Sequence, residues 1–578
     1  MVRKSNHEES LSIRGWGIIV TEPYILRWPA HPDGKAADHH TMKTRRDKVG
    51  SEFLPAWMSL LVALGIITVA FGTVSSHAAE RLANVFADNM VLQRDIAVPI
   101  WGWSEKGQVI KVSFADQDKT ATADESGRWM LRLDPLPASK EPRQMTVTGA
   151  MTQVINNILV GDVWICSGQS NMSWFLQDST NGKAEMSAAN DPNMRFLRVS
   201  QTNSPFPLED SDLRLSWEIC APVRENMWMT AVGFYFAREL LKEVDVPIGL
   251  IGANLGSTCI ETWIPISGFR SVPELGDPVD LHYKEFLAGM RKWLSEADAS
   301  MSSGEVVPNM PVDLISSGDF QQPAKCFNGM INPIIPFAIR GVIWYQGESN
   351  GAEGESYFHK MKALISSWRT LWNQDHGASG KGRDFPFYFV QLANFQPSNP
   401  DNPAGGETWT RLREAQLRAL SIPNTGMAVA IDIGEAENVH PANKQDVGRR
   451  LALWALAKNY GKEVAYSGPL YKSHAVEGNK IRIAFEHVGR GLCVAEKKGL
   501  ADSVELPTGQ LKCFAIAGDD QKWRWADAVI DGDTVVVSHP DVPAPVAVRY
   551  AFALNPGEVN FYNKDGLPAS PFRTDQWP

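Results

Sequence analysis

The chain has 578 residues, which is too long for one typical domain and predicts two or three. Its hydrophobic fraction of 44% and charged fraction of 21% are those of an ordinary globular protein. The net charge of −10, with no basic cluster in the body of the chain, argues against a nucleic-acid partner.

The first feature along the chain is an apolar run without charges at residues 56–72. Basic residues precede it at 42–48, and a small-x-small sequence follows at Ser76-His77-Ala78, the layout of a secretory signal removed after Ala78 or Ala79. A membrane anchor is the alternative because the run nearly reaches spanning length, but the cleavage site favours a signal. We therefore predict a signal region at 1–78 with the true start at Met42. The mature protein is expected to be secreted or periplasmic, without a stable membrane anchor.

All six cysteines follow this signal, in a compartment where disulfides are allowed. Cys493 and Cys513 flank a β-like segment and could pair. The sequence has no C-x-x-C motif and no His/Cys cluster, so we expect no metal site.

Residues 80–155 read as an N-terminal β module. Short strand-like segments follow one another, with turns at Glu105-Lys106-Gly107 and Glu125-Ser126-Gly127. This spacing is typical of a β-sandwich or jelly roll.

The pattern changes at residue 156. Apolar strands at 162–166, 247–253, 341–346, 385–393 and 427–433 alternate with amphipathic helices at 230–244, 357–372 and 447–460. Such alternation predicts a mostly parallel sheet covered on both faces, in a domain over 156–465. Residues 266–325 look like an insertion with its own helix, and residues 466–578 return to β signals and form a second β module.

The most informative segment is VWICSGQSNMSW at 163–174. Its strand ends at Gly168, so Ser170 is expected at the carboxyl edge of the sheet, where open α/β folds bind ligands. A helix starting there would favour negative charge on the serine oxygen. A plain N-cap serine is the alternative for this motif taken alone.

A serine hydroxyl needs a neighbouring base to take its proton. Among the histidines after the signal, only His440 stands between a strand (427–433) and a helix, which predicts the same sheet edge as Ser170. A surface loop histidine is the alternative for His440 alone.

A second serine motif competes with this one. Gly347-Glu-Ser349-Asn-Gly351 satisfies G-x-S-x-G, and Ser349, Asp432 and His440 follow in the chain order of an α/β-hydrolase. That elbow needs a helix directly after the serine, whereas Gly351 and Gly354 follow here. We therefore interpret this match as accidental.

GQSNM and five later segments together resemble the sialate O-acetylesterase group of the SGNH (GDSL-like) hydrolases. The later segments are 247–263, 327–350, 391–395, 409–416 and 432–453. The resemblance as a whole spans roughly residues 80–465. It implies an α/β fold whose core is a flavodoxin-like three-layer α/β/α SGNH domain, with β-sandwich-like modules at both ends. It also implies a serine carbohydrate O-acetylesterase that works through an acetyl-enzyme, without metal or organic cofactor.

The same resemblance assigns the site residues. Ser170 is the expected nucleophile and His440 the base; the backbone N–H groups of Ser170 and Gly256 and the side chain of Gln346 are the expected oxyanion donors. Close relatives carry Asp two residues before the histidine, where this chain has Asn438; the general SGNH spacing instead favours Glu437 as the triad acid. Three alternatives stay open, namely Asp432, Glu435, and a Ser-His dyad oriented by a backbone carbonyl. Glu348 is interpreted as structural, although a buried acid there could orient a partner.

The expected partner is an acetylated carbohydrate. One alternative is an acetyl esterase for plant polysaccharide such as xylan or pectin. A second, motivated by Asn438, is a catalytically impaired carbohydrate-binding protein on the same fold.

Overall fold

The computed structural model describes residues 80–211, 216–222, 229–276, 283–309, 320–374 and 384–577. The signal predicted at 1–78 lies outside these ranges. Within them, no helix is long and apolar enough to cross a membrane.

The N-terminal region consists of the strands that its alternating sequence predicts. β1 (Arg81–Leu82), β3 (Val98–Trp103) and β6 (Arg128–Leu133) form one sheet. β2 (Val91–Gln93), β4 (Val109–Phe114), β5 (Gln117–Thr122) and β7 (Ser139–Thr148) join a larger sheet. In β4, Ile110, Val112 and Phe114 are buried at every second position, the period of a half-buried strand.

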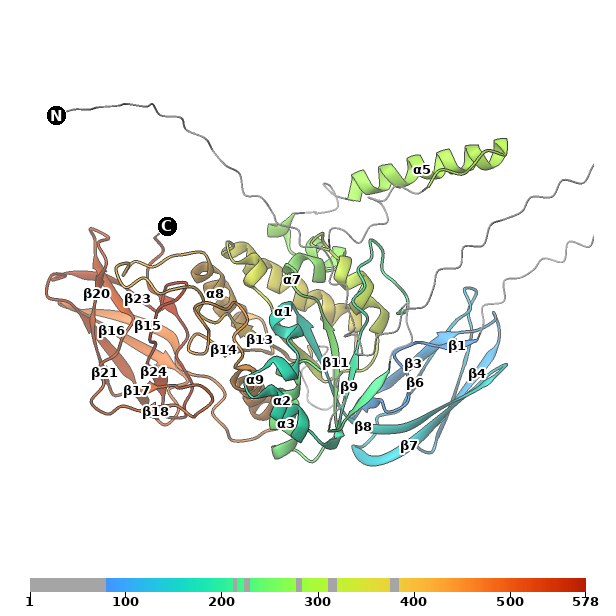
Figure 1. Ribbon diagram of the computed structural model, residues 1–578, viewed down its shortest axis with the longest axis horizontal. Coiled ribbons are helices and arrows are strands. Elements are labelled where there is room, and N and C mark those ends of the chain that lie inside the picture. The colour runs from blue at the N-terminus through green and yellow to red at the C-terminus, as the bar shows by residue number, and fades with distance from the viewer. Residues whose placement is uncertain are drawn as a thin grey trace, which may run out of the picture. The chain divides into compact units, whose positions relative to one another are not determined.

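One long strand connects this region to the rest of the fold. β8 (Thr152–Gly168) has 17 residues and runs without a break past residue 155. Its first part pairs antiparallel with β7, and its last part pairs in parallel with β11 (Ile248–Asn254) and β12 (Gly341–Tyr345). The strand that begins beside β7 therefore ends at Gly168, just before α1 (Ser170–Ser173) (Figure 1).

The central sheet has the strand order β10-β9-β11-β8-β12-β13-β14. The further strands are β9 (Asp191–Arg198), β10 (Trp217–Cys220), β13 (Phe387–Gln391) and β14 (Thr425–Val429), and only β10 pairs antiparallel along this path. From β8 the chain builds β11 on one side and later β12 on the other. The carboxyl ends of β8, β11 and β12 thus lie at the point where the strand order reverses, where open α/β sheets bind ligands.

Aromatic side chains hold helices against both faces of this sheet. Trp164 of β8 packs on Phe236 of α3 (Ala231–Glu243), and Tyr388 of β13 packs on Trp454 of α9 (Lys444–Asn459). Trp344 of β12 contacts α7 (Glu355–Trp372), next to which α4 (Ile266–Arg270) and α8 (Trp409–Arg418) pack. The fold is therefore a mixed α/β one with a central mixed sheet and smaller flanking sheets.

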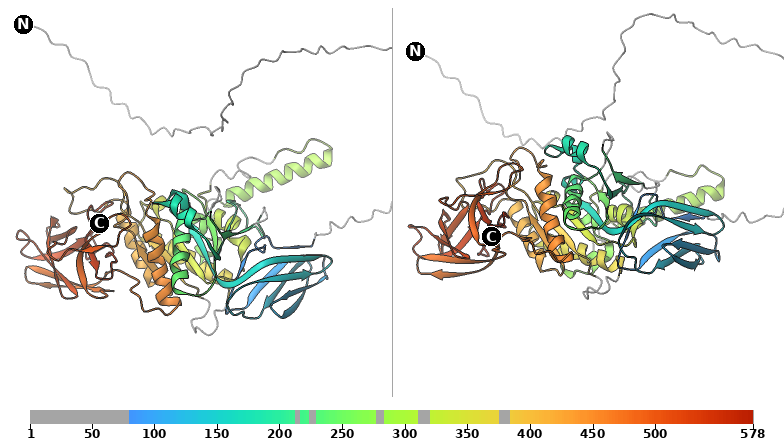
Figure 2. Two further views of the ribbon diagram at one scale, coloured as in Figure 1. Left: turned by 60° about the horizontal axis from the view of Figure 1, so that its bottom comes forward. Right: turned by 90° about the horizontal axis from the view of Figure 1, so that it is seen from below.

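Helices α3 and α9 lie side by side, drawn green and orange in Figure 2. Gly448 permits this approach, since a Cβ there would lie 2.6 Å from Cβ of Tyr235. Within the insertion predicted at 266–325, the expected helix is α5 (Tyr283–Ser303).

The C-terminal region is all β, as its sequence predicts. Its strands are β15 (Leu470–Glu477), β16 (Lys480–Glu486), β17 (Leu492–Glu496), β18 (Val504–Glu505), β19 (Phe514–Gly518), β20 (Arg524–Trp525), β21 (Asp527–Asp531), β22 (Thr534–Ser538), β23 (Pro545–Tyr550), β24 (Phe561–Asn563) and β25 (Phe572–Arg573). They enclose a hydrophobic core of their own. Cys493 and Cys513 carry free thiols, so the structure does not contain the disulfide that the sequence allowed.

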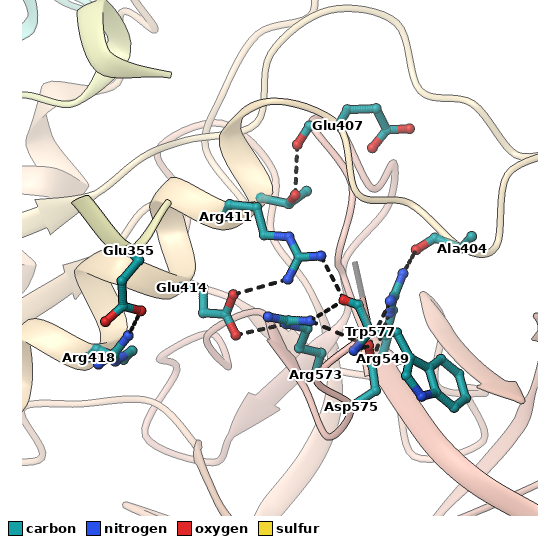
Figure 3. A network of polar contacts seen from close by, with 11 residues as sticks. Glu355, Ala404, Glu407, Arg411, Glu414, Arg418, Arg549, Arg573, Asp575 and Trp577 are labelled. Atoms are coloured by element: carbon teal, nitrogen blue, oxygen red, sulfur yellow. Dashed lines mark hydrogen bonds and ion pairs between the residues drawn. The ribbon is translucent and has the colours of Figure 1, made fainter. Parts of the chain in front are cut away.

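Arginine contacts attach this region to α8 (Figure 3). Arg573 of β25 donates to Glu414 at 2.8 Å, and Arg411 donates to the carbonyl of Trp577 at 2.9 Å. Asp575 accepts hydrogen bonds from Nε and Nη2 of Arg549, and this bidentate pair is almost fully buried. A buried pair with this geometry fixes the orientation of the groups that carry it.

Candidate active site

The turn that follows β8 is held in place by its two neighbouring strands. Gly168 has φ +134, and a Cβ there would lie 2.1 Å from the carbonyl oxygen of Tyr345, so only glycine fits. Gln169 N–H donates to Tyr345 O at 3.0 Å, and Leu255 N–H donates to Gly168 O at 3.1 Å. The short helix α1 (Ser170–Ser173) begins directly after this turn. Ser170 therefore projects from the carboxyl end of β8.

The structure brings Ser170 and His440 together, although 270 positions separate them. Oγ of Ser170 lies 2.8 Å from Nε2 of His440. The imidazole stacks on the ring of Trp174, with a centroid distance of 5.0 Å and an angle of 23° between planes. Burial, and secondarily the nearby cation of Lys444, lower the pKa of His440 below its ordinary value. The imidazole is therefore mainly neutral at neutral pH and can accept a proton.

The loop that carries His440 is fixed by an amide and a carboxylate. Asn438 accepts the His440 backbone N–H at 2.9 Å and donates to the His440 carbonyl at 2.8 Å. Glu435 in turn accepts from Nδ2 of Asn438 at 3.1 Å and from the backbone N–H of Ala442 at 2.7 Å. Asn438 and Glu435 therefore set the path of the backbone at the base.

No carboxylate of the described residues reaches the ring of His440. Across the described ranges, no hydrogen bond or ion pair joins an acid to that imidazole, and the favoured triad acid Glu437 is exposed. The reason is the loop geometry, since the contacts of Asn438 and Glu435 leave Glu437 facing solvent. Asp432 has other partners: it accepts hydrogen bonds from Nη1 and Nη2 of Arg450 at 2.6 and 2.7 Å and from the Tyr562 hydroxyl at 2.9 Å.

The two predicted oxyanion residues outside α1 differ in their placement. Gly256 lies against the serine, since a Cβ there would be 3.6 Å from Cβ of Ser170. The Gln346 side chain is fully buried and already paired: Nε2 donates to Thr258 O at 3.1 Å and to Oδ1 of Asn350 at 2.7 Å. Both amide protons are thus used, one to join the loops after β11 and β12 and the other within the loop after β12. The expectation that Gln346 offers a free donor is not met.

The competing serine, Ser349, has no contact with His440. Ser349 lies in the short helix η7 (Glu348–Asn350), where its backbone N–H donates to Oε1 of Gln169 at 3.1 Å. The next long helix, α7, begins only at Glu355. Ser170, and not Ser349, is the serine next to His440.

Sequence reasoning missed a buried polar cluster beside the pair. Nδ2 of Asn171 donates to Oε1 of Glu348 at 2.5 Å and to the carbonyl of Val439 at 3.0 Å, and Oδ1 of Asn171 accepts from Nζ of Lys444. Burial raises the pKa of Glu348 and lowers the pKa of Lys444 to about 7. The sequence offers little signal for this cluster, because Lys444 stands ahead of the helix predicted at 447–460, whereas α9 begins at Lys444 itself.

The described residues contain no group of three or more His, Cys, Asp or Glu side chains arranged to hold a metal ion.

Known proteins resemble this chain over most of its length. The family described as carbohydrate esterase, sialic acid-specific acetylesterase matches residues 160–300 and 318–457. The sialate O-acetylesterase of Mus musculus is 30% identical over 549 residues, covering 88% of this chain and 97% of the mouse protein. That of Homo sapiens is 28% identical, covering 90% and 98%. The crystal structure of a carbohydrate acetylesterase from Xanthomonas citri aligns with a TM-score of 0.71 and 35% identity, covering 86% of this chain and all of that one.

Proposed function

Because the chain belongs to the sialic acid-specific acetylesterase family of carbohydrate esterases, we propose that it removes acetyl groups from sugars with Ser170 as nucleophile and His440 as base. The observation that carries this proposal is the 2.8 Å contact between Oγ of Ser170 and Nε2 of His440, at the strand-order reversal of the sheet.

In the first half of the reaction, Oγ of Ser170 attacks the acetyl carbonyl carbon while its proton passes to Nε2 of His440. The tetrahedral intermediate then collapses and breaks the bond to the sugar oxygen, which takes the proton from His440. The products are the free sugar hydroxyl and an acetylated Ser170. In the second half, His440 takes a proton from water, whose oxygen attacks the acetyl carbon. Collapse releases acetic acid and returns the proton to Oγ.

The intermediate carries negative charge on the former carbonyl oxygen, which needs hydrogen-bond donors. We assign this role to the backbone N–H groups of Ser170 and Gly256, the two predicted donors that lie next to each other. The Gln346 amide is left out because Thr258 and Asn350 already accept its protons. Glu437 is also left out, so the machinery is a Ser-His dyad whose imidazole is oriented by Trp174 and by the Asn438 contacts with its backbone.

We extend this proposal to the fold, the domains and the location of the protein. The central sheet and its helices form an SGNH-type α/β/α core over 156–465, supported by helices packed on both faces. Residues 80–155 and 466–578 are flanking β modules. The mature protein acts outside the cytoplasm, secreted or in the periplasm, as the segment 1–78 indicates.

The test compares Ser170→Ala with Ser349→Ala. Activity is measured with 4-nitrophenyl acetate and as acetate released from O-acetylated sialic acid, acetylated xylan and acetylated pectin fragments. We expect Ser170→Ala to lose at least about 10³-fold in kcat on each substrate turned over, and Ser349→Ala to stay near the wild type. The family predicts the highest kcat/KM on O-acetylated sialic acid. Loss of activity in a folded Ser349→Ala, or full activity in Ser170→Ala, contradicts the nucleophile assignment.

A further inference from the structure

Lys444 occupies an energetically unfavourable position for a cation, in contact with the residue that follows the proposed nucleophile. It is fully buried and is the first residue of α9, where the positive end of the helix dipole opposes a cation. Its Nζ donates to Oδ1 of Asn171 and lies 5.4 Å from the ring centroid of Tyr345 and 5.6 Å from that of Trp174. An amide oxygen and two aromatic faces only partly replace the lost hydration of an ammonium group. Buried ionisable groups with strongly shifted pKa values are concentrated at functional sites.

The partner of Lys444 connects the two halves of the proposed catalytic pair. Asn171 is the residue after Ser170, and its Nδ2 donates to the carbonyl of Val439, the residue before His440. An ammonium group can only donate, so Lys444 holds Oδ1 of Asn171 on its own side and directs Nδ2 toward Val439. One amide thereby links α9, the nucleophile turn and the base loop.

The Asn171 amide also contacts an acid, Glu348. Oε1 of Glu348 accepts from the same Nδ2 of Asn171, while Oε2 of Glu348 is buried and has no hydrogen-bond partner. The titratable groups that face Lys444 are Glu348 from η7, Tyr345 from β12, and Glu435 and His440 from the loop before α9. The positive charge of Lys444 in turn lowers the pKa of His440.

We propose that Lys444 is a positioning residue for acetyl transfer: through Asn171 it keeps His440 on Ser170, and its charge opposes protonation of the imidazole. This inference rests on the proposed function, since it assumes that His440 is the base. No carboxylate of the described residues contacts the imidazole, so the loop that carries His440 is held by the contacts of Asn438 and Asn171 instead. The charge that acts on the ring is the positive charge of Lys444.

The charge of Lys444 lowers the pKa of His440. A positive charge beside the imidazole disfavours the imidazolium form, so removing that charge raises the pKa of His440. The acidic limb of kcat/KM reports the pKa of the free base. Lys444 carries its charge on the acidic side of its own pKa of about 7, where the acidic limb is measured.

The experiment compares three variants with a control on the same helix. Lys444→Met removes the charge and the donor, Lys444→Arg keeps the charge, and Asn171→Ala removes the link while keeping the lysine. The control is Lys458→Met, an exposed lysine of α9. Each protein is checked by circular dichroism and thermal unfolding, and kcat and KM on 4-nitrophenyl acetate are measured from pH 4.5 to 8.5.

For Lys444→Met we expect kcat to fall about 10- to 100-fold. We also expect its acidic limb to move up by roughly half a pH unit to one unit. Asn171→Ala is expected to lower kcat with the acidic limb in place, and Lys444→Arg to leave the limb at the wild-type position. Lys458→Met is expected to match the wild type in both. KM should change little in every variant, because none of these side chains is assigned to the substrate.

A folded Lys444→Met with the wild-type pH profile overturns the electrostatic part, and a folded Asn171→Ala with wild-type kcat overturns the positioning part. If Lys444→Met does not fold, Lys444→Arg and Asn171→Ala still decide both parts: a shifted limb in Lys444→Arg contradicts the charge argument. Failure of the proposed function is separate, because it is recognised by activity that persists in Ser170→Ala.

Discussion

Asn438 holds the backbone of His440 on both sides, since it accepts the His440 N–H at 2.9 Å and donates to the His440 carbonyl at 2.8 Å. An aspartate at this position could accept the same N–H, but it could not donate to the carbonyl. The residue that departs from the pattern of close relatives therefore has a structural task of its own.

We expect Asn438→Ala to lower kcat about 10²-fold, because both contacts that place the imidazole are lost, with KM nearly unchanged. Asn438→Asp should retain more activity than the alanine variant, since it keeps the acceptor of the His440 N–H. Steady-state kinetics on 4-nitrophenyl acetate check both. Wild-type kcat in a folded Asn438→Ala contradicts the argument.

Two acids in the same loop should behave differently. Glu437→Gln is expected to change kcat less than about twofold, because Glu437 is exposed and has no contact with the imidazole. Glu435→Ala should lower kcat by about tenfold, because it releases Asn438 and the Ala442 N–H. If Glu437 is instead a triad acid, Glu437→Gln must lose several orders of magnitude, about 10⁴-fold in a comparable case. One kinetic comparison of the two variants therefore decides the question.

The acid side of the pH profile should be governed by His440. Its pKa is lowered by burial and by Lys444, and the neutral imidazole is the active form. The acidic limb of kcat/KM should therefore have its midpoint below the ordinary histidine value of 6.5. Measuring kcat/KM between pH 4.5 and 8 tests this, and a midpoint above 7 would falsify the assignment of the lowered pKa.

Asp432 is predicted to contribute to stability and not to catalysis. Its carboxylate and the guanidinium of Arg450 are almost fully buried, and Asp432→Asn would remove the carboxylate that this cation hydrogen-bonds. We expect a loss of about 3 to 5 kcal/mol in the free energy of unfolding. The matched control is Glu125→Gln in the exposed pair with Lys106, which should cost less than about 1 kcal/mol. Urea unfolding of the two variants measures both, and equal losses would contradict the burial argument.

Much of the fold could be predicted from the sequence because its signals are local. The strand at 341–346 is found as β12, and the helix at 357–372 is found as α7. Ser170 and His440 could be placed near each other because both follow apolar strands and precede helices, and the carboxyl ends of parallel strands lie at one edge of the sheet.

The remaining details depend on contacts that residue spacing does not encode. Glu437 stands at the family spacing, but the side chains of Asn438 and Glu435 decide where that loop turns. Gln346 follows the right strand, but Thr258 and Asn350 take its amide protons. The link from Lys444 through Asn171 to Val439 joins segments that are far apart in the sequence, so no local pattern predicts it.

The continuity of β8 constrains how the protein can be divided. A fragment starting at residue 156 would cut this strand near its beginning, and it would remove β7 and β2, which pair with it on the N-terminal side. Exposed strand edges of this kind promote aggregation. An expression boundary that respects the fold therefore lies ahead of β1, and an exchange of β2 and β7 for other strands would also have to replace the part of β8 that pairs with them.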